Sequence, residues 1–290
     1  MEKQNKNNNL NSEENFFNSL PKIEVNYSKS KNDVWNELSA LTVSKKKKVK
    51  TIRLSWMKYA VAACFILLVG YTGFIYMFTT TIVCPKGEHL SVLLPDNSRV
   101  ELNAHSNIAY KPYWWNYSRK VKFEGEAFFD ITKGSKFEIE SKNGKTYILG
   151  TSFNIYARGD DYKVTCYTGK VKVVSNSTSD KILLLPKDHA YLTKNGKLEV
   201  FKDNKAEEKI LWRDHLFLFT NTPLNLVFEE IELQYDINIV EKGKFGQTHT
   251  GNFGKEKSVE KVLYNVCMPN GLKFHKGPGK NYIITKIIPK

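Results

Sequence analysis

The sequence predicts a mainly β chain that ends in an α+β module and is held by a single transmembrane helix. Short apolar runs recur about every ten residues between positions 88 and 200, and strand and helix patterns alternate after Trp212. An uncharged apolar segment precedes both regions. We therefore expect a short arm (1–58), a transmembrane helix (59–82), a β domain (83–202) and a C-terminal α+β module (210–290).

Composition and charge limit the classes of function. The 290 residues are 41% hydrophobic and 26% charged, which is enough for one or two folded domains outside a membrane. The net charge of +14 suggests nucleic acid as a partner, but much of it lies between positions 45 and 58, directly before the apolar segment. That placement is typical of a topogenic signal, so we expect no direct binding of nucleic acid.

The transmembrane helix is predicted because about 20 apolar residues suffice to cross a hydrocarbon layer of ~30 Å. A buried core helix rarely runs this long without a polar face, and the apolar part of a cleaved signal peptide would begin near the N-terminus. Aromatic residues flank the segment, with Trp56 and Tyr59 before it and Tyr76 and Phe78 at its end. The basic N-terminal flank places the arm in the cytoplasm and residues 83–290 outside.

Two apolar clusters interrupt the polar arm, whose residues 1–15 are expected to be disordered. The second cluster has the spacing of one face of a short helix, with Asn32 or Asp33 as its cap. Such a face either binds a partner protein or lies on the inner membrane surface. The clusters consist of Phe16, Phe17 and Leu20, and of Val34, Trp35, Leu38 and Leu41.

The β domain and the module differ in their patterns. In the β domain, turn residues separate many short strands, which indicates a sandwich, a roll or a β-solenoid. The best hairpin turn is Asn143-Gly144, because this pair accepts the positive φ angles of a type I′ turn. The polar stretch 203–209 is either the boundary between the two regions or a short helix that leads to the module. From position 210 we expect a two-layer domain of doubled strand-helix-strand units, with helices at 223–234 and 258–267.

The sequence carries no signature of an enzyme, a metal site or a cofactor site. The six histidines stand singly and the cysteines form no CxxC pair. One disulfide among Cys84, Cys166 and Cys267 is possible in an oxidising compartment, but the sequence selects no pair. We interpret Gly125-Glu126 as a turn glycine followed by strand residues, and Trp114-Trp115 as core or partner contacts rather than a platform for a sugar or a base.

The order of several motifs resembles a known family. The succession runs LPDNSRVELN at 94–103, SNIAY at 106–110, RKVKFEGEAFFDI at 119–131, FEI at 137–139, LGTSFNI at 149–155, GKVKV at 169–173 and FTNTPL at 219–224. Over roughly residues 85–290 this succession looks like the FecR family of anti-sigma factors.

The resemblance implies a topology and a set of partners. In that family a cytoplasmic arm binds an extracytoplasmic-function sigma factor, one helix crosses the inner membrane, and the periplasmic part meets the signalling domain of a TonB-dependent outer-membrane transporter. It also implies that the final module resembles that signalling domain, and that an intramembrane or periplasmic protease releases the arm. The arm is shorter than in many relatives, and both inhibition and co-activation of the sigma factor stay open. The sigma contact would fall to Phe16, Phe17, Leu20, Val34, Trp35 and Leu38.

Relatives also break their own chain at a Gly-Thr step by an N-to-O acyl shift, so the resemblance marks Gly150 and Thr151 as a self-cleavage site. A hydroxyl next to a glycine carbonyl can attack it if the fold strains the peptide and removes competing solvent. The alternative is a strand with a glycine bulge.

An alternative function is that of a membrane-anchored structural or glycan-binding envelope protein without sigma-factor regulation. Deletion of residues 1–44 discriminates between the two functions. If the arm serves only as a membrane anchor, the deletion leaves expression of a transporter operon unchanged.

Overall fold

The structure is a computed structural model that describes residues 15, 16, 18–22, 24, 26, 28–42, 55–243, 245–254 and 258–287. The chain divides into two units, residues 1–62 and residues 63–290, and each is described by itself. The disorder expected for residues 1–15 falls, apart from residue 15, outside the described residues.

The arm contains one regular helix, α2 (Lys31–Thr42), which buries none of its residues. Its cap differs from the expected Asn32 or Asp33. The hydroxyl of Ser30 accepts a hydrogen bond from the backbone N–H of Asp33 at 3.2 Å, so Ser30 is the capping residue. A serine side chain reaches the third helical amide from this position, which the two polar residues inside the first turn cannot do.

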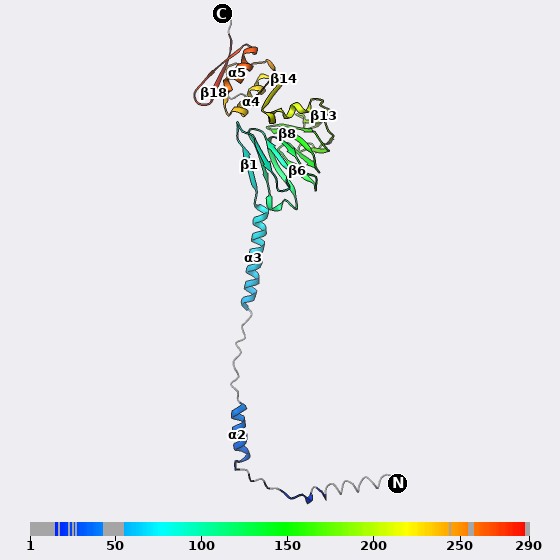
Figure 1. The fold of residues 1–290 in the computed structure, drawn as a ribbon, viewed down its shortest axis with the longest axis vertical. Helices are drawn as coiled ribbons and strands as arrows, with labels where there is room; N and C mark the ends of the chain where they lie inside the picture. Colours follow the sequence, from blue (N-terminus) through cyan, green and yellow to red (C-terminus); the bar gives the residue numbers. More distant parts are fainter. Residues whose placement is uncertain are drawn as a thin grey trace, which may run out of the picture. The chain divides into compact units, whose positions relative to one another are not determined.

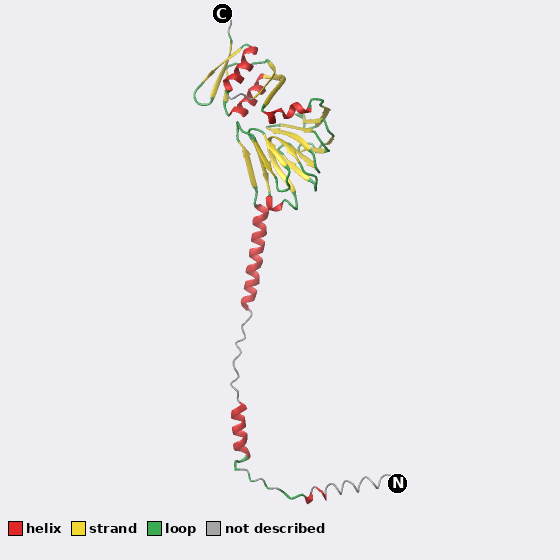
Figure 2. Cartoon of the chain, in the orientation of Figure 1, coloured by secondary structure: helices red, strands yellow, loops and turns green. Residues whose placement is uncertain are grey.

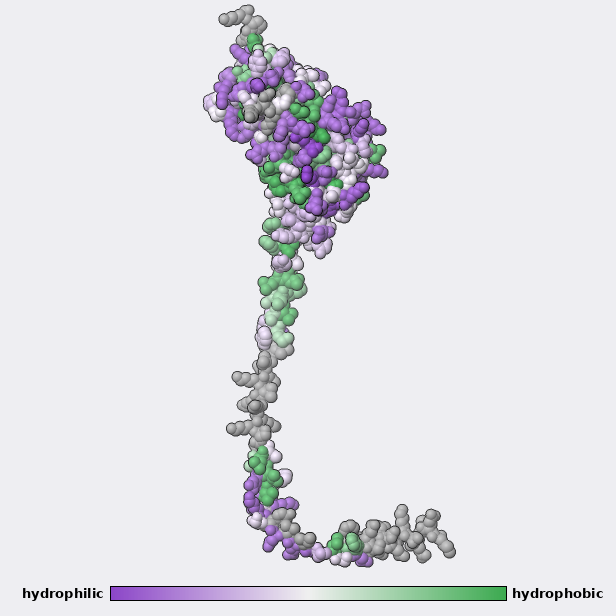
Figure 3. All heavy atoms as spheres, in the orientation of Figure 1, coloured by the Kyte–Doolittle hydropathy of each residue, from purple (hydrophilic) through white to green (hydrophobic). Residues whose placement is uncertain are grey.

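The long apolar helix is α3 (Ser55–Met77), which begins and ends earlier than the expected 59–82. Within residues 56–77 an 18-residue stretch has a mean hydropathy of 2.0, and none of that stretch is buried. At 1.5 Å per residue, residues 56–77 span about 33 Å, enough to cross a membrane. The visible surface of α3 is mostly hydrophobic (Figure 3). The helix ends early because the β-branched residues after it form strand β1 (Thr80–Cys84), which pairs with β4 (Ser106–Tyr110).

The β domain is one 13-stranded sheet, with strands arranged as Figures 1 and 2 show. After β1, the sheet continues with β2 (Leu90–Leu93) and β3 (Arg99–Leu102). The short 3-10 helix η1 (Pro112–Trp114) then leads from β4 to β5 (Arg119–Asp130), the longest strand of the sheet. The later strands are β6 (Phe137–Glu140), β7 (Gly144–Ile148), β8 (Ser152–Arg158), β9 (Asp161–Cys166), β10 (Val171–Ser175), β11 (Lys181–Leu184), β12 (Asp188–Leu192) and β13 (Leu198–Lys202).

Strand β5 joins the two halves of this sheet. Its first part pairs with β4 and β6, and its second part, from Gly125, pairs with β3 and β8. Gly125 has a φ of +112°, and a Cβ on it would lie 2.3 Å from the hydroxyl of Ser106. The expected turn glycine is therefore a mid-strand glycine, required because the strand changes partners where another backbone approaches closely.

The turn at 141–144 also differs from expectation. Its central residues are Lys142 and Asn143, because the N–H of Ser141 bonds the carbonyl of Gly144 at 2.9 Å, and neither Asn143 nor Gly144 has a positive φ. A Cβ on Gly144 would lie 2.2 Å from the ring of Tyr162. Tertiary packing of that ring, not a type I′ turn, requires the glycine.

A single hydrophobic core fills the β domain. Its largest fully buried side chains include Phe129 and Phe153, which stack with ring centroids 5.2 Å apart. Trp115 is 3% exposed and packs edge-on against Phe137, so the second of the two tryptophans belongs to this core.

The C-terminal module follows a 3-10 helix, η2 (Ala206–Asp214). Its elements are β14 (Leu216–Pro223), α4 (Leu224–Tyr235), β15 (Asn238–Glu241), β16 (Thr248–Gly254), α5 (Val259–Cys267), the 3-10 helix η3 (Met268–Asn270), β17 (Leu272–Lys276) and β18 (Asn281–Lys286). Strands β14 and β16 form one antiparallel pair, and β15, β18 and β17 form a second sheet. The apolar faces of α4 and α5 supply a separate core around Phe228 and Leu263.

Candidate functional site

The Gly150-Thr151 step lies in the connection between β7 and β8. Gly150 has a φ of +153°, and a Cβ on it would lie 2.7 Å from the Cα of Lys133. The carbonyls on either side are held, because Leu149 O accepts from the N–H of Gly134 at 2.9 Å and Thr151 O accepts from that of Ile131 at 3.0 Å. The peptide is thus fixed in a conformation that favours glycine.

Thr151 is 4% exposed, and its hydroxyl is buried without a hydrogen-bond partner among the described residues. Buried hydroxyls are normally hydrogen-bonded, so this one is unusual. Gly169, with a φ of +67°, covers the same step: a Cβ there would lie 2.5 Å from Thr151 Cγ2 and 3.0 Å from the carbonyl oxygen of Gly150. The step is therefore enclosed, and its hydroxyl is not committed to another group.

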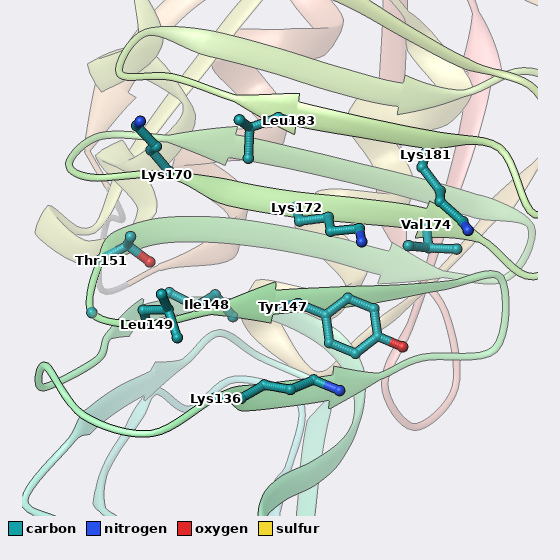
Figure 4. A pocket seen from close by; sticks show the side chains of 11 residues that line it. Lys136, Tyr147, Ile148, Leu149, Thr151, Lys170, Lys172, Val174, Lys181 and Leu183 are labelled. Atoms are coloured by element: carbon teal, nitrogen blue, oxygen red, sulfur yellow. The ribbon is translucent and has the colours of Figure 1, made fainter.

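A cavity of about 760 Å³ adjoins the step. Figure 4 shows Thr151 and Leu149 at one end of it, with lysine side chains along β10 and β11. The residues that line it are Lys136, Tyr147, Ile148, Leu149, Gly150, Thr151, Lys170, Lys172, Val174, Lys181 and Leu183.

A second group of polar residues connects helix α4 of the module with the β domain. Gln234 donates from Nε2 to Asn103 Oδ1 at 2.7 Å and to Glu230 Oε1 at 2.9 Å. Asn103 in turn donates from Nδ2 to Glu126 Oε2 at 2.8 Å. Arg158 lies 3.7 Å from Glu230, between Nη1 and Oε2. These five residues form a continuous polar cluster that crosses from β5 and β8 to α4.

Glu126 is the buried acid of this polar cluster. Burial raises its pKa to about 7, and the nearby carboxylate of Glu230 acts in the same direction, while Arg158 and the amides of Asn103 and Asn154 oppose the shift. Asn154 donates from Nδ2 to Glu126 Oε1 at 3.1 Å, whereas its own Oδ1 is buried without a partner among the described residues. A buried acid with a raised pKa thus lies at a contact between the β domain and the module.

A bidentate ion pair makes a further connection. Arg213 of η2 donates from Nε and Nη2 to the two carboxylate oxygens of Glu101 at 2.7 and 2.8 Å, and its guanidinium lies 4.0 Å from the ring centroid of Phe128. The backbone N–H of Gly87 also donates to Leu233 O at 2.8 Å. Helix α4 and η2 are thus both bonded to the β domain.

The predicted sigma-binding residues of the arm are exposed where they are described. Trp35 is 71% exposed, and Val34, Leu38 and Leu41 lie beside it on one face of α2. Phe16 and Leu20 are exposed as well, and Phe17 lies outside the described residues. Within this unit the apolar face of α2 is therefore available to a partner.

The polar cluster is the part of the site that sequence reasoning missed. Gln234 and Asn103 are 131 positions apart; Asn103 ends the stretch LPDNSRVELN, but nothing in that stretch indicates a partner on a distant helix, and Gln234 stands in no motif. The only available signals were the polar Gln234 on the otherwise apolar face of the expected helix 223–234 and the acid after Gly125.

Comparisons with known proteins agree with this organisation. Residues 80–172 match the family model described as FecR protein, and residues 216–284 match the model described as FecR, C-terminal. Two crystal structures of a proposed anti-sigma factor from Parabacteroides distasonis ATCC 8503 resemble this chain, each with a TM-score of 0.64 and 28% identity, and the matches cover 72% and 71% of this chain and 99% of the solved chains. No curated protein matches the sequence. The chain therefore belongs to the FecR family of anti-sigma factors.

Proposed function

We propose that this chain is a single-pass inner-membrane anti-sigma factor whose cytoplasmic arm binds an extracytoplasmic-function sigma factor. The observation that carries the proposal is the apolar face of α2, where Trp35 is 71% exposed, on the N-terminal side of a helix apolar enough to cross a membrane. A helical face of this kind fits a hydrophobic groove on a partner protein. Residues 83–290 lie in the periplasm and receive the signal from a TonB-dependent transporter's signalling domain.

The sigma contact is tested with the full chain in detergent and a co-expressed extracytoplasmic-function sigma factor from the same organism. Trp35→Ala removes the largest side chain of the face and should abolish co-purification, because aromatic anchors dominate such contacts. Asn36→Ala changes an exposed neighbour on α2 and should leave co-purification unchanged. Wild-type protein that retains no sigma factor would contradict the proposal. Unchanged expression of the transporter operon after deletion of residues 1–44 would instead favour an envelope protein.

We further propose that the chain cleaves itself between Gly150 and Thr151. The hydroxyl of Thr151 attacks the carbonyl carbon of Gly150, an ester forms at the threonine oxygen, and the C–N bond breaks as the nitrogen takes up a proton. Water then hydrolyses the ester and leaves a carboxylate on Gly150 and a free amine on Thr151. The buried, unbonded hydroxyl and the fixed glycine support this proposal, and a protease acting in or near the membrane would complete release of the arm.

Self-cleavage is tested on a denaturing gel. Wild-type protein and Thr151→Ser, which keeps the hydroxyl, should each give two fragments, whereas Thr151→Ala should give one full-length band. A single full-length band in all three proteins excludes self-cleavage and leaves the sigma contact untouched.

A further inference from the structure

We propose that a cavity at the end of α3, between the last turn of that helix and the sheet, binds the phosphate-bearing headgroup of an anionic phospholipid. The proposal rests on the membrane insertion of α3 proposed above, and it requires neither the sigma factor nor the transporter.

The position of the cavity sets its depth relative to a membrane. The cavity has a volume of about 350 Å³ and is lined by Tyr76 in the last turn of α3 and by Thr79 directly after the helix. The apolar span ends at Met77, and strand β1 begins at Thr80. The last turn of a spanning helix lies where hydrocarbon gives way to headgroups, so a cavity that begins at Tyr76 lies at the level of the lipid phosphates.

Aromatic side chains line the cavity, and further aromatic residues adjoin it in the sequence. The ring of Tyr76 meets that of Trp114 edge-on at 5.3 Å, and Lys111 Nζ lies 3.9 Å from the centroid of the same Tyr76 ring. Nearby, Tyr113 and Tyr117 are 60% and 79% exposed. Tryptophan and tyrosine with an exposed ring are the residues that concentrate at membrane interfaces, because one end of the ring is apolar and the other is polar.

Lysines supply the charge. Lys120 and Lys122 lie two residues apart on β5, so they project from the same face of the sheet, opposite the buried Val121. Lys120 is already engaged, because its Nζ lies 3.3 Å from Glu138 and 2.9 Å from Glu140.

Lys111 and Lys122 also line the cavity, and neither forms an ion pair with a carboxylate within the described part of the chain. Two uncompensated ammonium groups at headgroup depth attract an anion. The anion that this location offers at high local concentration is the phosphate of an anionic lipid. A bound headgroup would join the end of α3 to β4 and β5, and so fix how the periplasmic domain stands on the bilayer.

Native mass spectrometry of the full chain in detergent tests the proposal, with phosphatidylglycerol, phosphatidylcholine and inorganic phosphate as separate probes. We expect retention of phosphatidylglycerol over phosphatidylcholine, and a loss of affinity of about tenfold or more in Lys111→Glu/Lys122→Glu, because each lysine near an anionic surface contributes several-fold. Lys111→Gln/Lys122→Gln should show a smaller loss in the same direction. The matched control is Lys194→Glu/Lys197→Glu, which makes the same change of charge at exposed positions between β12 and β13 and should bind like wild type.

Equal loss in the control pair, or no preference for phosphatidylglycerol, would overturn the lipid site. Complete displacement of the lipid by equimolar inorganic phosphate would also overturn it and assign the cavity to a free anion. Alkaline carbonate extraction of membranes separates these failures from failure of the topology. If the protein stays in the membrane pellet but its lipid binding does not depend on the two lysines, only the lipid site is contradicted. If the protein is extracted, membrane insertion is contradicted as well.

Discussion

Gln234 on helix α4 donates a hydrogen bond to Asn103 of the β domain, with 2.7 Å between Nε2 and Oδ1. Gln234 is 2% exposed, and its carboxamide oxygen lies 3.0 Å from His89 Nε2. One side chain thus satisfies polar groups on both domains in a place that water does not reach. Any signal that moves α4 relative to the β domain has to break these bonds.

Gln234→Ala is therefore expected to lower the free energy of unfolding of the full chain by about 1–3 kcal/mol, because Asn103 loses a buried donor. Thermal unfolding followed by circular dichroism measures the change. Gln247→Ala is the matched control, since Gln247 makes a single exposed hydrogen bond to Asn270 O. An equal change in the two variants would contradict a special role for Gln234.

Stability should fall as pH rises through the range in which Glu126 titrates. The pKa of Glu126 is raised to about 7 in the folded protein, above roughly 4.3 in an unfolded chain, so the folded state binds the proton more tightly. The contribution is fully present below about pH 4 and is lost progressively up to about pH 7, for a total of roughly 4 kcal/mol.

Glu126→Gln should remove this pH dependence. The new amide stays neutral and can donate to the unbonded Oδ1 of Asn154 if the Asn154 amide turns over. Urea unfolding at a series of pH values between 4 and 8 provides the measurement. Glu124→Gln, an exposed change on the same strand, should keep the wild-type slope. A slope that survives in Glu126→Gln would assign the titration to another group.

Gly169→Ala should slow cleavage at Gly150-Thr151 by about tenfold or more, because the added methyl group displaces the Thr151 side chain and a misplacement of about 1 Å can cost ~100-fold in rate. Gly159→Ala is the matched control. Gly159 also has a positive φ, but a Cβ there meets nothing within 4 Å. Fragment yield over time on a denaturing gel measures both. Equal rates in the two variants would show that Gly169 does not position the step.

Arg213→Lys should weaken the attachment of η2 to the β domain by about 1 kcal/mol, because a lysine cannot make both hydrogen bonds to Glu101 at once. Limited proteolysis around residues 203–214 is the measurement, and cleavage there should become faster. Arg99→Lys, at an exposed position of the same strand as Glu101, should leave the proteolysis rate unchanged. Equal acceleration in both variants would contradict the prediction.

The order of elements could be predicted from the sequence because it depends on local pattern. Alternating apolar residues placed most strands of the β domain, and the spacing of Val227, Phe228 and Ile231 placed α4. The predicted bounds of α3 differ from the observed ones by several residues. Thr80 and Thr81 pair with β4, and hydropathy carries no information about a strand partner that far along the chain. The Gly150-Thr151 step was identified through a family resemblance, but the sequence did not predict that Thr151 would be buried.

The sequence by itself determined the apolar helix, the mainly β character and the exposed apolar face around Trp35, because each follows from residues close together in the chain. Only the tertiary structure decided the rest. Gly144 is required by the ring of Tyr162 rather than by turn propensity. The pKa of Glu126 is raised by burial and by the carboxylate of Glu230 on α4, about a hundred residues later in the chain. Burial and long-range hydrogen bonding depend on which surfaces meet, and the local pattern of a chain does not contain that information.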